Sequence, residues 1–175
     1  MSLSKKLFLA ISLNILANIL VWVVGEKAVM DLFTVKEEMK VTGQATRNIM
    51  LADMMHDALR ADVLNALYAS GEPTSGISKE TIRQELNDHS NTFESAIKEN
   101  ESLPLSDAAK QRLSAVKPKL EDYKNKASEI IELSYTSRSD AINMMPEFVE
   151  TFDALATEME ATADALSADA EISRR

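Results

Sequence analysis

Residues 109–130 have the sequence AKQRLSAVKPKLEDYKNKASEI, in which an apolar side chain recurs after every three or four positions. This alternation of fours and threes is typical of an amphipathic helix that packs one narrow face against other helices. Pro118 falls inside the pattern, and we expect a kink there because proline cannot donate a backbone hydrogen bond. The apolar positions are Ala109, Leu113, Val116, Leu120, Tyr123, Ala127 and Ile130.

The sequence on both sides of this stretch predicts three more helices. A turn cluster at Ser70–Gly76 ends the first of them, and Ser106-Asp107 supplies capping groups for the start of the third. Pro146 lies in or near the first turns of the fourth, where a proline costs less. The helices are expected at about Ala28–Ala69, from Ser78 to before Leu103, from Ser106 through Ile130, and from about Ser139 through Ala170. The stripe of the second helix is Ile82, Leu86, His89, Phe93 and Ile97, and that of the fourth is Ile142, Met145, Val149, Phe152, Ala156, Met159, Ala163, Leu166 and Ala170.

The composition agrees with an all-α chain. The 175 residues suffice for one domain, and they include only 4 Gly and 4 Pro, whereas 45% of them are hydrophobic. No stretch shows the period-two alternation of a strand, so the sequence predicts an up-down-up-down four-helix bundle. The absence of Cys excludes disulfides, thiolate zinc sites and Cys nucleophiles. The formal charge of −9 argues against a nucleic-acid partner.

The N-terminal part of the chain predicts a membrane anchor. Leu7–Val24 carries no charge and as a helix reaches ~27 Å, close to the thickness of the hydrocarbon core of a bilayer. Trp22 is placed at one interface, and Lys5 and Lys6 keep residues 1–6 in the cytoplasm. We therefore expect a transmembrane helix at 7–24 that continues into the first bundle helix. The bulk of the chain, 28–175, is expected in the periplasm, anchored in the inner membrane.

Two features of this anchor leave alternatives open. A cleaved secretory signal is the other interpretation of Leu7–Val24, although no A-x-A-like cleavage site follows it. Asn14 and Asn18 lie on one helix face. They either hydrogen-bond to a neighbouring transmembrane helix or are merely tolerated there.

The first bundle helix has two apolar faces, which predicts two burial roles. One face serves the bundle core, and the other serves a second subunit across a two-fold axis, so we expect a homodimer through this helix. The alternative is a fully buried helix in a monomer. The core face consists of Ala45, Ile49, Ala52, Leu59, Val63 and Ala66, and the second face of Leu51, Met54, Ala58, Ala61, Leu64 and Tyr68.

The order of the helices also predicts a topology. The fourth helix runs antiparallel to the first and aims residues 172–175 back at the membrane surface. The second and third helices are expected to be shorter than the other two. The membrane-proximal part is then a two-helix stalk, suited to passing small axial shifts across the bilayer.

Two short runs resemble bacterial methyl-accepting chemotaxis receptors. Met54–Leu64, MMHDALRADVL, is similar to a stretch on the first bundle helix of many such receptors, and Met145–Phe148, MPEF, followed by Phe152 and Leu155, is similar to their last bundle helix. The overall architecture resembles the extracytoplasmic half of these proteins. The resemblance implies a dimeric periplasmic sensor domain that binds a small ligand, such as an organic acid or amino acid, and signals through a second membrane helix.

The chain departs from that family in what it lacks. It has no second span, no membrane-adjacent relay module and no long cytoplasmic hairpin with methylation sites. We expect a fragment or a truncated paralogue, which senses but cannot control a kinase. The same fold in a histidine kinase or cyclase is one alternative function, and a membrane-anchored helical adaptor is another.

Five residues are predicted to bind the ligand. Arginine donates two parallel hydrogen bonds to a carboxylate, so a receptor for a small acid requires forked donors of this kind. Counting from the first turn places Arg83 near the level of Leu64, one turn above Arg60. Receptors of the resembled type use arginines of the first bundle helix for a ligand carboxylate. The alternative for each arginine is an ordinary surface ion pair. The candidates are Arg60, Arg83, Tyr135, Thr136 and Arg138.

A metal site is a weaker hypothesis. Symmetric counting places His56 and His89 in one layer of the bundle, where with Asp53 they could hold a metal, or as two imidazoles a haem. The alternative is a hydrogen-bonded polar layer, and the methionines are more simply core filler than soft-metal ligands. No cofactor is expected. We also expect no enzyme activity, because Gly-rich phosphate loops, H-E-x-x-H, G-x-S-x-G and E-x-x-H pairs do not occur in the sequence.

Overall fold

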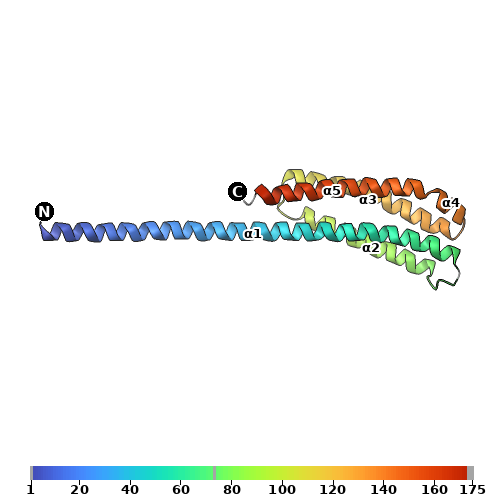
Figure 1. Cartoon of the computed structure of the whole chain (residues 1–175), viewed down its shortest axis with the longest axis horizontal. Helices are drawn as coiled ribbons and strands as arrows, with labels where there is room; N and C mark the ends of the chain where they lie inside the picture. The colour runs from blue at the N-terminus through green and yellow to red at the C-terminus, as the bar shows by residue number, and fades with distance from the viewer. Residues whose placement is uncertain (1, 73, 173–175) are drawn as a thin grey trace.

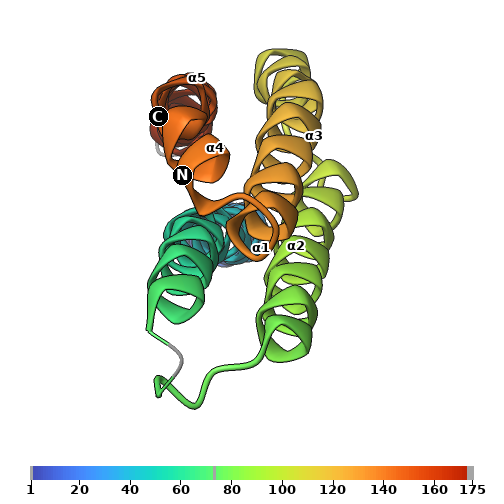
Figure 2. The same cartoon turned by 90° about the vertical axis from the view of Figure 1, so that its right-hand side faces the viewer.

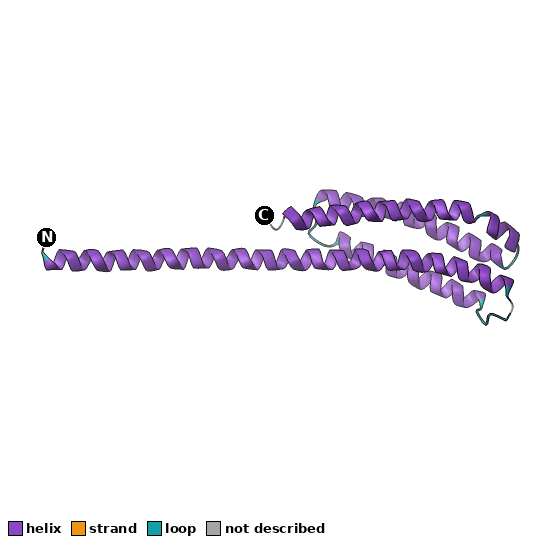
Figure 3. Cartoon of the chain, viewed as in Figure 1, coloured by secondary structure: helices purple, strands orange, loops and turns teal. Residues whose placement is uncertain are grey.

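The computed structural model describes residues 2–72 and 74–172, in which every regular element is a helix (Figures 1 and 3). Pro73 of the first turn and residues 173–175, expected to face the membrane, lie outside the described residues. The predicted four-helix bundle is confirmed, with α4 and α5 together forming its fourth rod. The helices are α1 Leu3–Gly71, α2 Lys79–Glu101, α3 Asp107–Ser134, α4 Arg138–Asn143 and α5 Met145–Ile172.

Helix α1 joins the apolar segment to the bundle without a break. Its 69 residues span ~104 Å, and its first buried residue is Ala45 (Figure 1). N-terminal to that point the helix carries exposed apolar side chains. Within the described part of the chain, α1 is the one helix long and apolar enough to cross a membrane.

The bundle has the predicted up-down-up-down order. The α1–α2 and α3–α4 turns lie at the end far from the apolar segment, called the distal end below (Figure 1). Viewed along the bundle, α1 packs against α2, α3 and α5 (Figure 2). Helices α2 and α5 occupy opposite corners, and no contact joins them among the described residues. The seven predicted apolar residues of α3 are all buried.

The predicted helix starts are confirmed by their caps. The hydroxyl of Ser78 accepts the backbone N–H of Thr81 at 3.0 Å, and that of Ser106 accepts the N–H of Ala109 at 3.1 Å. Each bond satisfies one of the free N–H groups that a helix leaves at its N-terminus. Gly76, just before α2, has φ 72°, a left-handed conformation that glycine adopts without a steric penalty.

Pro118 does not end α3, which runs unbroken from Asp107 to Ser134. The missing proline N–H would have bonded to the carbonyl of Ser114. Both residues are exposed, so water can satisfy that carbonyl at little cost.

The break in the fourth rod falls before Pro146 rather than inside a continuous helix. Helix α4 ends at Asn143, and α5 restarts at Met145, with the N–H of Phe148 bonded to the carbonyl of Met144 at 3.1 Å. Proline has no N–H and its ring clashes with the carbonyl four residues earlier, so it fits only the first turn of a new helix. The predicted core positions Ile142 and Val149 are wrong, because both are exposed and the residues that precede them, Ala141 and Phe148, are buried instead. The buried positions there are Ala141, Phe148, Leu155, Met159, Thr162 and Leu166.

The predicted two-helix stalk is also wrong for the described residues. The backbone N–H of Ser106 donates to Asp169 Oδ2 at 2.9 Å, so the α2–α3 turn and the last turn of α5 lie at one level. As predicted, α2 and α3, with 23 and 28 residues, are shorter than α1 and than the fourth rod, which runs from Arg138 to Ile172, but the described part of that rod ends within one turn of this level. Beyond that level the described part of α1 continues alone toward its N-terminus (Figure 1).

The two apolar faces of α1 have different environments. All six residues of the predicted core face are buried. The second face is largely exposed, which contradicts the alternative of a fully buried helix. We call it the outer face of α1. Its large side chains are Met50, Leu51, Met54, Leu64 and Tyr68, each between 37% and 64% exposed.

Candidate functional site

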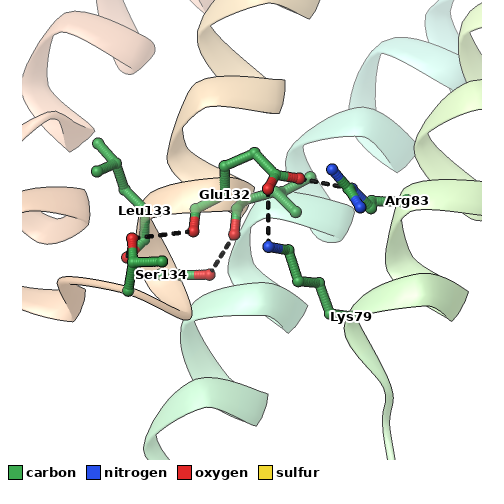
Figure 4. Close-up of polar contacts among 7 residues, drawn as sticks. Lys79, Arg83, Glu132, Leu133 and Ser134 are labelled. Carbon is green, nitrogen blue, oxygen red and sulfur yellow. Dashed lines mark hydrogen bonds and ion pairs between the residues drawn. The ribbon is translucent and has the colours of Figure 1, made fainter.

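Three charged side chains meet at the distal end of the bundle (Figure 4). Lys79 and Arg83 come from the first turns of α2, and Glu132 from the last turn of α3. Lys79 Nζ lies 2.7 Å from Glu132 Oε2, and Arg83 Nε lies 2.5 Å from Glu132 Oε1. The hydrogen bond from Lys79, assisted by the charge of Arg83, holds the pKa of Glu132 below its usual value. Two cations therefore hold one carboxylate between α2 and α3.

Two predicted ligand residues lie beside these charges. The ring of Tyr135 has Lys79 Nζ 5.7 Å from its centre, within the range of a cation–π contact. Its hydroxyl is buried and has no hydrogen-bond partner among the described residues, and burial raises its pKa. Thr136 is exposed, and its hydroxyl donates to the carbonyl of Glu132 at 3.4 Å. We call Lys79, Arg83, Glu132, Tyr135 and Thr136 the distal cluster.

Arg138 has a different contact. Its Nε donates to the carbonyl of Leu67 at 3.1 Å, near the end of α1. A Cβ added at Gly71 would lie 3.0 Å from the same nitrogen, so glycine gives the guanidinium room to approach. The same carbonyl also accepts the hydroxyl of Ser70 at 3.1 Å, so Arg138 adds a further hydrogen bond there and ties α4 to the last turns of α1.

Arg60 lies apart from the distal cluster. Its guanidinium carbon is 4.9 Å from the ring centre of Phe152 on α5, a cation–π contact at the surface. Because Asp62 pairs with His89, antiparallel counting places Arg83 near the level of Tyr68, about one turn beyond the level expected. Arg60 and Arg83 are then eight residues apart in level, ~12 Å. The structure links Arg83 to Tyr135 through Glu132 and Lys79. Thr136 bonds only to carbonyls of its own helix, and Arg60 lies elsewhere.

The two histidines do not share a layer. His56 Nε2 lies 3.2 Å from the carbonyl of Phe152, whereas His89 Nδ1 lies 2.8 Å from Asp62 Oδ2, six residues further along α1. Burial raises the pKa of Asp62, while the hydrogen bond with His89 opposes that shift. Among the described residues, no group of three His, Asp or Glu side chains could hold a metal ion. The predicted shared layer is therefore wrong, and each ring has its own structural partner.

His56 belongs to a group of four rings, the aromatic layer, with the buried Tyr123 and Phe148 and the partly buried Phe152. The His56 and Phe152 rings are stacked at 3.9 Å, and Tyr123 and Phe148 at 5.0 Å. Tyr123 donates its hydroxyl to the carbonyl of His56 at 3.1 Å. Burial lowers the pKa of His56 and raises that of Tyr123. This layer joins α1, α3 and α5.

Sequence reasoning missed Lys79 and Glu132. Lys79 precedes Arg83 by four residues, a spacing that places both cations on one face of α2. Glu132 precedes the predicted Tyr135 by three residues on α3 and therefore shares its face. Helical spacing from Arg83 and Tyr135 could have identified both residues as neighbours on the same helix faces. Their pairing with each other depends on the register of α2 against α3, which the sequence does not give.

The chain matches one family model, described as a four helix bundle sensory module for signal transduction, over residues 1–175. No curated protein and no solved structure matches it significantly. Such modules are receptor domains for signalling rather than a family of enzymes. The match covers the apolar segment and the bundle alike. The chain therefore belongs to the four-helix-bundle sensory modules of chemotaxis receptors.

Proposed function

We propose that this chain is the extracytoplasmic sensor region of a transmembrane chemotaxis receptor that binds a small ligand and passes a helix displacement across the membrane. The observation that carries the proposal is the course of α1, which connects the apolar segment without a break to the distal end of the bundle. Helix α5 runs back from that end toward the end of the bundle that lies nearer the apolar segment (Figure 1). A ligand at the distal end can therefore bias the position of α5 relative to α1.

The distribution of charge supports a periplasmic bundle. Lys5 and Lys6 precede the apolar segment, and positively charged flanks remain on the cytoplasmic side. The bundle then lies outside the inner membrane, where it meets solutes before they enter the cell.

The distal cluster is the proposed ligand site, and a carboxylate of an organic acid or amino acid is the proposed ligand group. Glu132 demonstrates that the space between Lys79 and Arg83 accommodates a carboxylate. A ligand carboxylate can replace it with similar bonds and can add contacts to Tyr135 and Thr136. Arg138 keeps the neighbouring turn in place, and Arg60 is a separate candidate at the contact between α1 and α5.

The outer face of α1 is the proposed dimer contact. Leu64 and Tyr68 are about half exposed there, on the side of α1 that faces away from its own bundle. The chain has no Cys, so a Leu64→Cys variant of the full chain forms an intermolecular disulfide only if this face meets a copy of itself. Glu160→Cys, at an exposed position of α5, is the matched control and should cross-link far less.

Ligand binding is tested by thermal unfolding of the full chain in detergent, with a panel of carboxylic acids, amino acids and divalent metals. A true ligand at 100 times its Kd stabilises the fold by ~2.7 kcal/mol. Arg83→Gln should abolish that stabilisation. Arg112→Gln should retain it, because Arg112 has the same 53% exposure and also pairs with one glutamate.

The outcomes separate the candidate functions. Stabilisation by one acid that depends on Arg83 supports the sensor proposal. Stabilisation by no compound, together with strong association with other helical proteins, supports a membrane-anchored adaptor and contradicts the proposal. Equal loss in the Arg83 and Arg112 variants would remove the distal cluster as the site.

A further inference from the structure

A groove with a volume of about 410 Å³ lies between α2 and α3, and four residues of each helix line it. We call it the α2–α3 groove. On α2 the lining begins at Glu94, which is eleven residues, or ~16 Å, from Arg83 of the distal cluster. The α2–α3 groove is therefore separate from the distal cluster and lies in the half of the bundle nearer the apolar segment (Figure 1).

The lining of the α2–α3 groove is mainly apolar. Ile97 from α2 and Val116 and Leu120 from α3 are core residues that form its floor. Lys98 and Lys117 lie at its rim, and a lysine lays its methylene stem along apolar surface while its ammonium stays in water. A concave and apolar lining of this volume is typical of a site for a small molecule.

Ion pairs between the two helices bound the groove at both ends. Lys117 Nζ lies 2.8 Å from Glu101 Oε1 at one end. At the other end Lys124 pairs with Glu94 across the helices, and its Nζ lies 3.1 Å from Glu121 Oε1. The two pairs are seven residues apart on each helix, which is ~10 Å. The space between them accommodates a short chain that runs along the helices.

Lys98 is the cation of the lining that pairs with no carboxylate among the described residues. The carboxylate of Glu101 is bonded to Lys117, and those of Glu94 and Glu121 are both bonded to Lys124. The ammonium of Lys98 has three hydrogen-bond donors for another partner. A positive charge of this kind beside an apolar lining complements a molecule with an apolar body and one anionic group.

We propose that the α2–α3 groove binds an aliphatic monocarboxylate, with its alkyl chain over the apolar floor and its carboxylate at Lys98. This second site goes beyond the ligand site proposed above. The distal cluster holds a carboxylate between two cations, whereas the groove recognises the alkyl chain and supplies one cation. An occupant contacts both helices and therefore stabilises the packing of α2 against α3.

The length of the alkyl chain tests the apolar contact. Sodium butyrate and sodium hexanoate are titrated into the full chain in detergent by calorimetry, with detergent alone as the blank. Hexanoate should bind roughly tenfold more tightly than butyrate, because each fully buried methylene group improves the affinity about fourfold. Equal affinities, or no binding of hexanoate, would overturn the proposal.

The charge of Lys98 is tested by substitution. Lys98→Met keeps the apolar stem and removes the ammonium, so it should weaken hexanoate binding about three- to tenfold. Lys98→Arg keeps the charge and should keep the affinity. Lys110→Met is the matched control, because Lys110 is also an exposed lysine without an ion pair among the described residues but lies outside the groove. An unchanged affinity in Lys98→Met, or an equal loss in Lys110→Met, would overturn the proposal.

Arg83→Gln separates this second site from the proposed function. Hexanoate should bind Arg83→Gln as tightly as it binds the unaltered chain. A loss of hexanoate binding in Arg83→Gln would assign the carboxylate to the distal cluster, so the second site would be wrong while the proposed ligand site stands. An acid that depends on Arg83 should in turn bind Lys98→Met with unchanged affinity.

Discussion

The aromatic layer and the distal cluster both contain polar side chains between helices, yet they bond in opposite ways. In the aromatic layer, His56 and Tyr123 are buried and bond to backbone carbonyls. In the distal cluster, Lys79, Arg83 and Glu132 are partly exposed and bond to one another through their side chains. A backbone carbonyl cannot leave, whereas a carboxylate side chain can rotate away and be replaced.

This difference distinguishes side chains that stabilise the fold from side chains that can bind a ligand. Buried polar side chains that bond to backbone carbonyls fix the axial position of one helix relative to another. Removal of such a side chain leaves an unsatisfied polar group in the core. Exposed ion pairs contribute little to stability, so evolution can exchange their partners at small cost. A ligand site is therefore expected at the distal cluster rather than in the aromatic layer.

The largest expected effect is in the aromatic layer. Phe148→Ala removes a fully buried ring stacked on Tyr123 and should lower the free energy of unfolding by about 3–5 kcal/mol. Urea unfolding of the full chain, followed by circular dichroism, measures the loss. A loss below ~1 kcal/mol would mean that this layer does not form the core described above. Val149→Ala, at the neighbouring exposed position, is the control.

A buried pair nearer the apolar segment of α1 should show an intermediate effect. Asn48 Nδ2 donates to Asn100 Oδ1 at 2.9 Å, and Asn100 Nδ2 donates to the carbonyl of Ala45 at 3.1 Å. Asn100→Ala leaves the Asn48 amide buried without its acceptor and should cost about 1–3 kcal/mol. The same unfolding measurement applies. If the double variant with Asn48→Ala costs much more than Asn100→Ala alone, the pair does not act as a unit.

The aromatic layer should also make stability depend on pH. Burial lowers the pKa of His56 from its ordinary 6.5, so the unfolded chain takes up a proton at a higher pH than the folded chain. The free energy of unfolding should then fall as the pH decreases through 6.5. Urea unfolding between about pH 5 and pH 7.5 measures this slope. His56→Gln should flatten it, and an identical slope in that variant would assign the effect to other groups.

Most of the fold follows from the sequence because the helix signals act locally. The stripe from Ala109 to Ile130 and the capping serines specify helices from neighbouring residues alone, and the structure agrees with them. The fourth helix shows the limit. Apolar residues occupy neighbouring positions there, so Ile142 and Val149 fit the predicted stripe, but Ala141 and Phe148, each one residue earlier, form the core instead.

The candidate site could be predicted only in part, since it depends on the register between helices. Arg83, Tyr135 and Thr136 were predicted from the chemistry of their side chains, and Glu132 and Lys79 connect Arg83 to Tyr135. The pairing of His89 with Asp62 reports the axial register of α2 against α1, and no local sequence pattern specifies that register. An error of about one turn in the counted register placed Arg83 too near Arg60 and His89 too near His56.

The smallest expected effect on stability is in the distal cluster. Glu132→Gln removes the charge held by Lys79 and Arg83, and an exposed pair of this kind contributes about 0–1 kcal/mol. Glu101→Gln, which weakens the exposed pair with Lys117, is the control and should behave alike in urea unfolding. The two variants should differ in ligand binding alone. Because Glu132 competes with a ligand carboxylate, Glu132→Gln should tighten binding of the stabilising acid in calorimetry, whereas Glu101→Gln should not. A weaker affinity in Glu132→Gln would mean that Glu132 itself contacts the ligand, and that Lys79 and Arg83 only hold Glu132 in position.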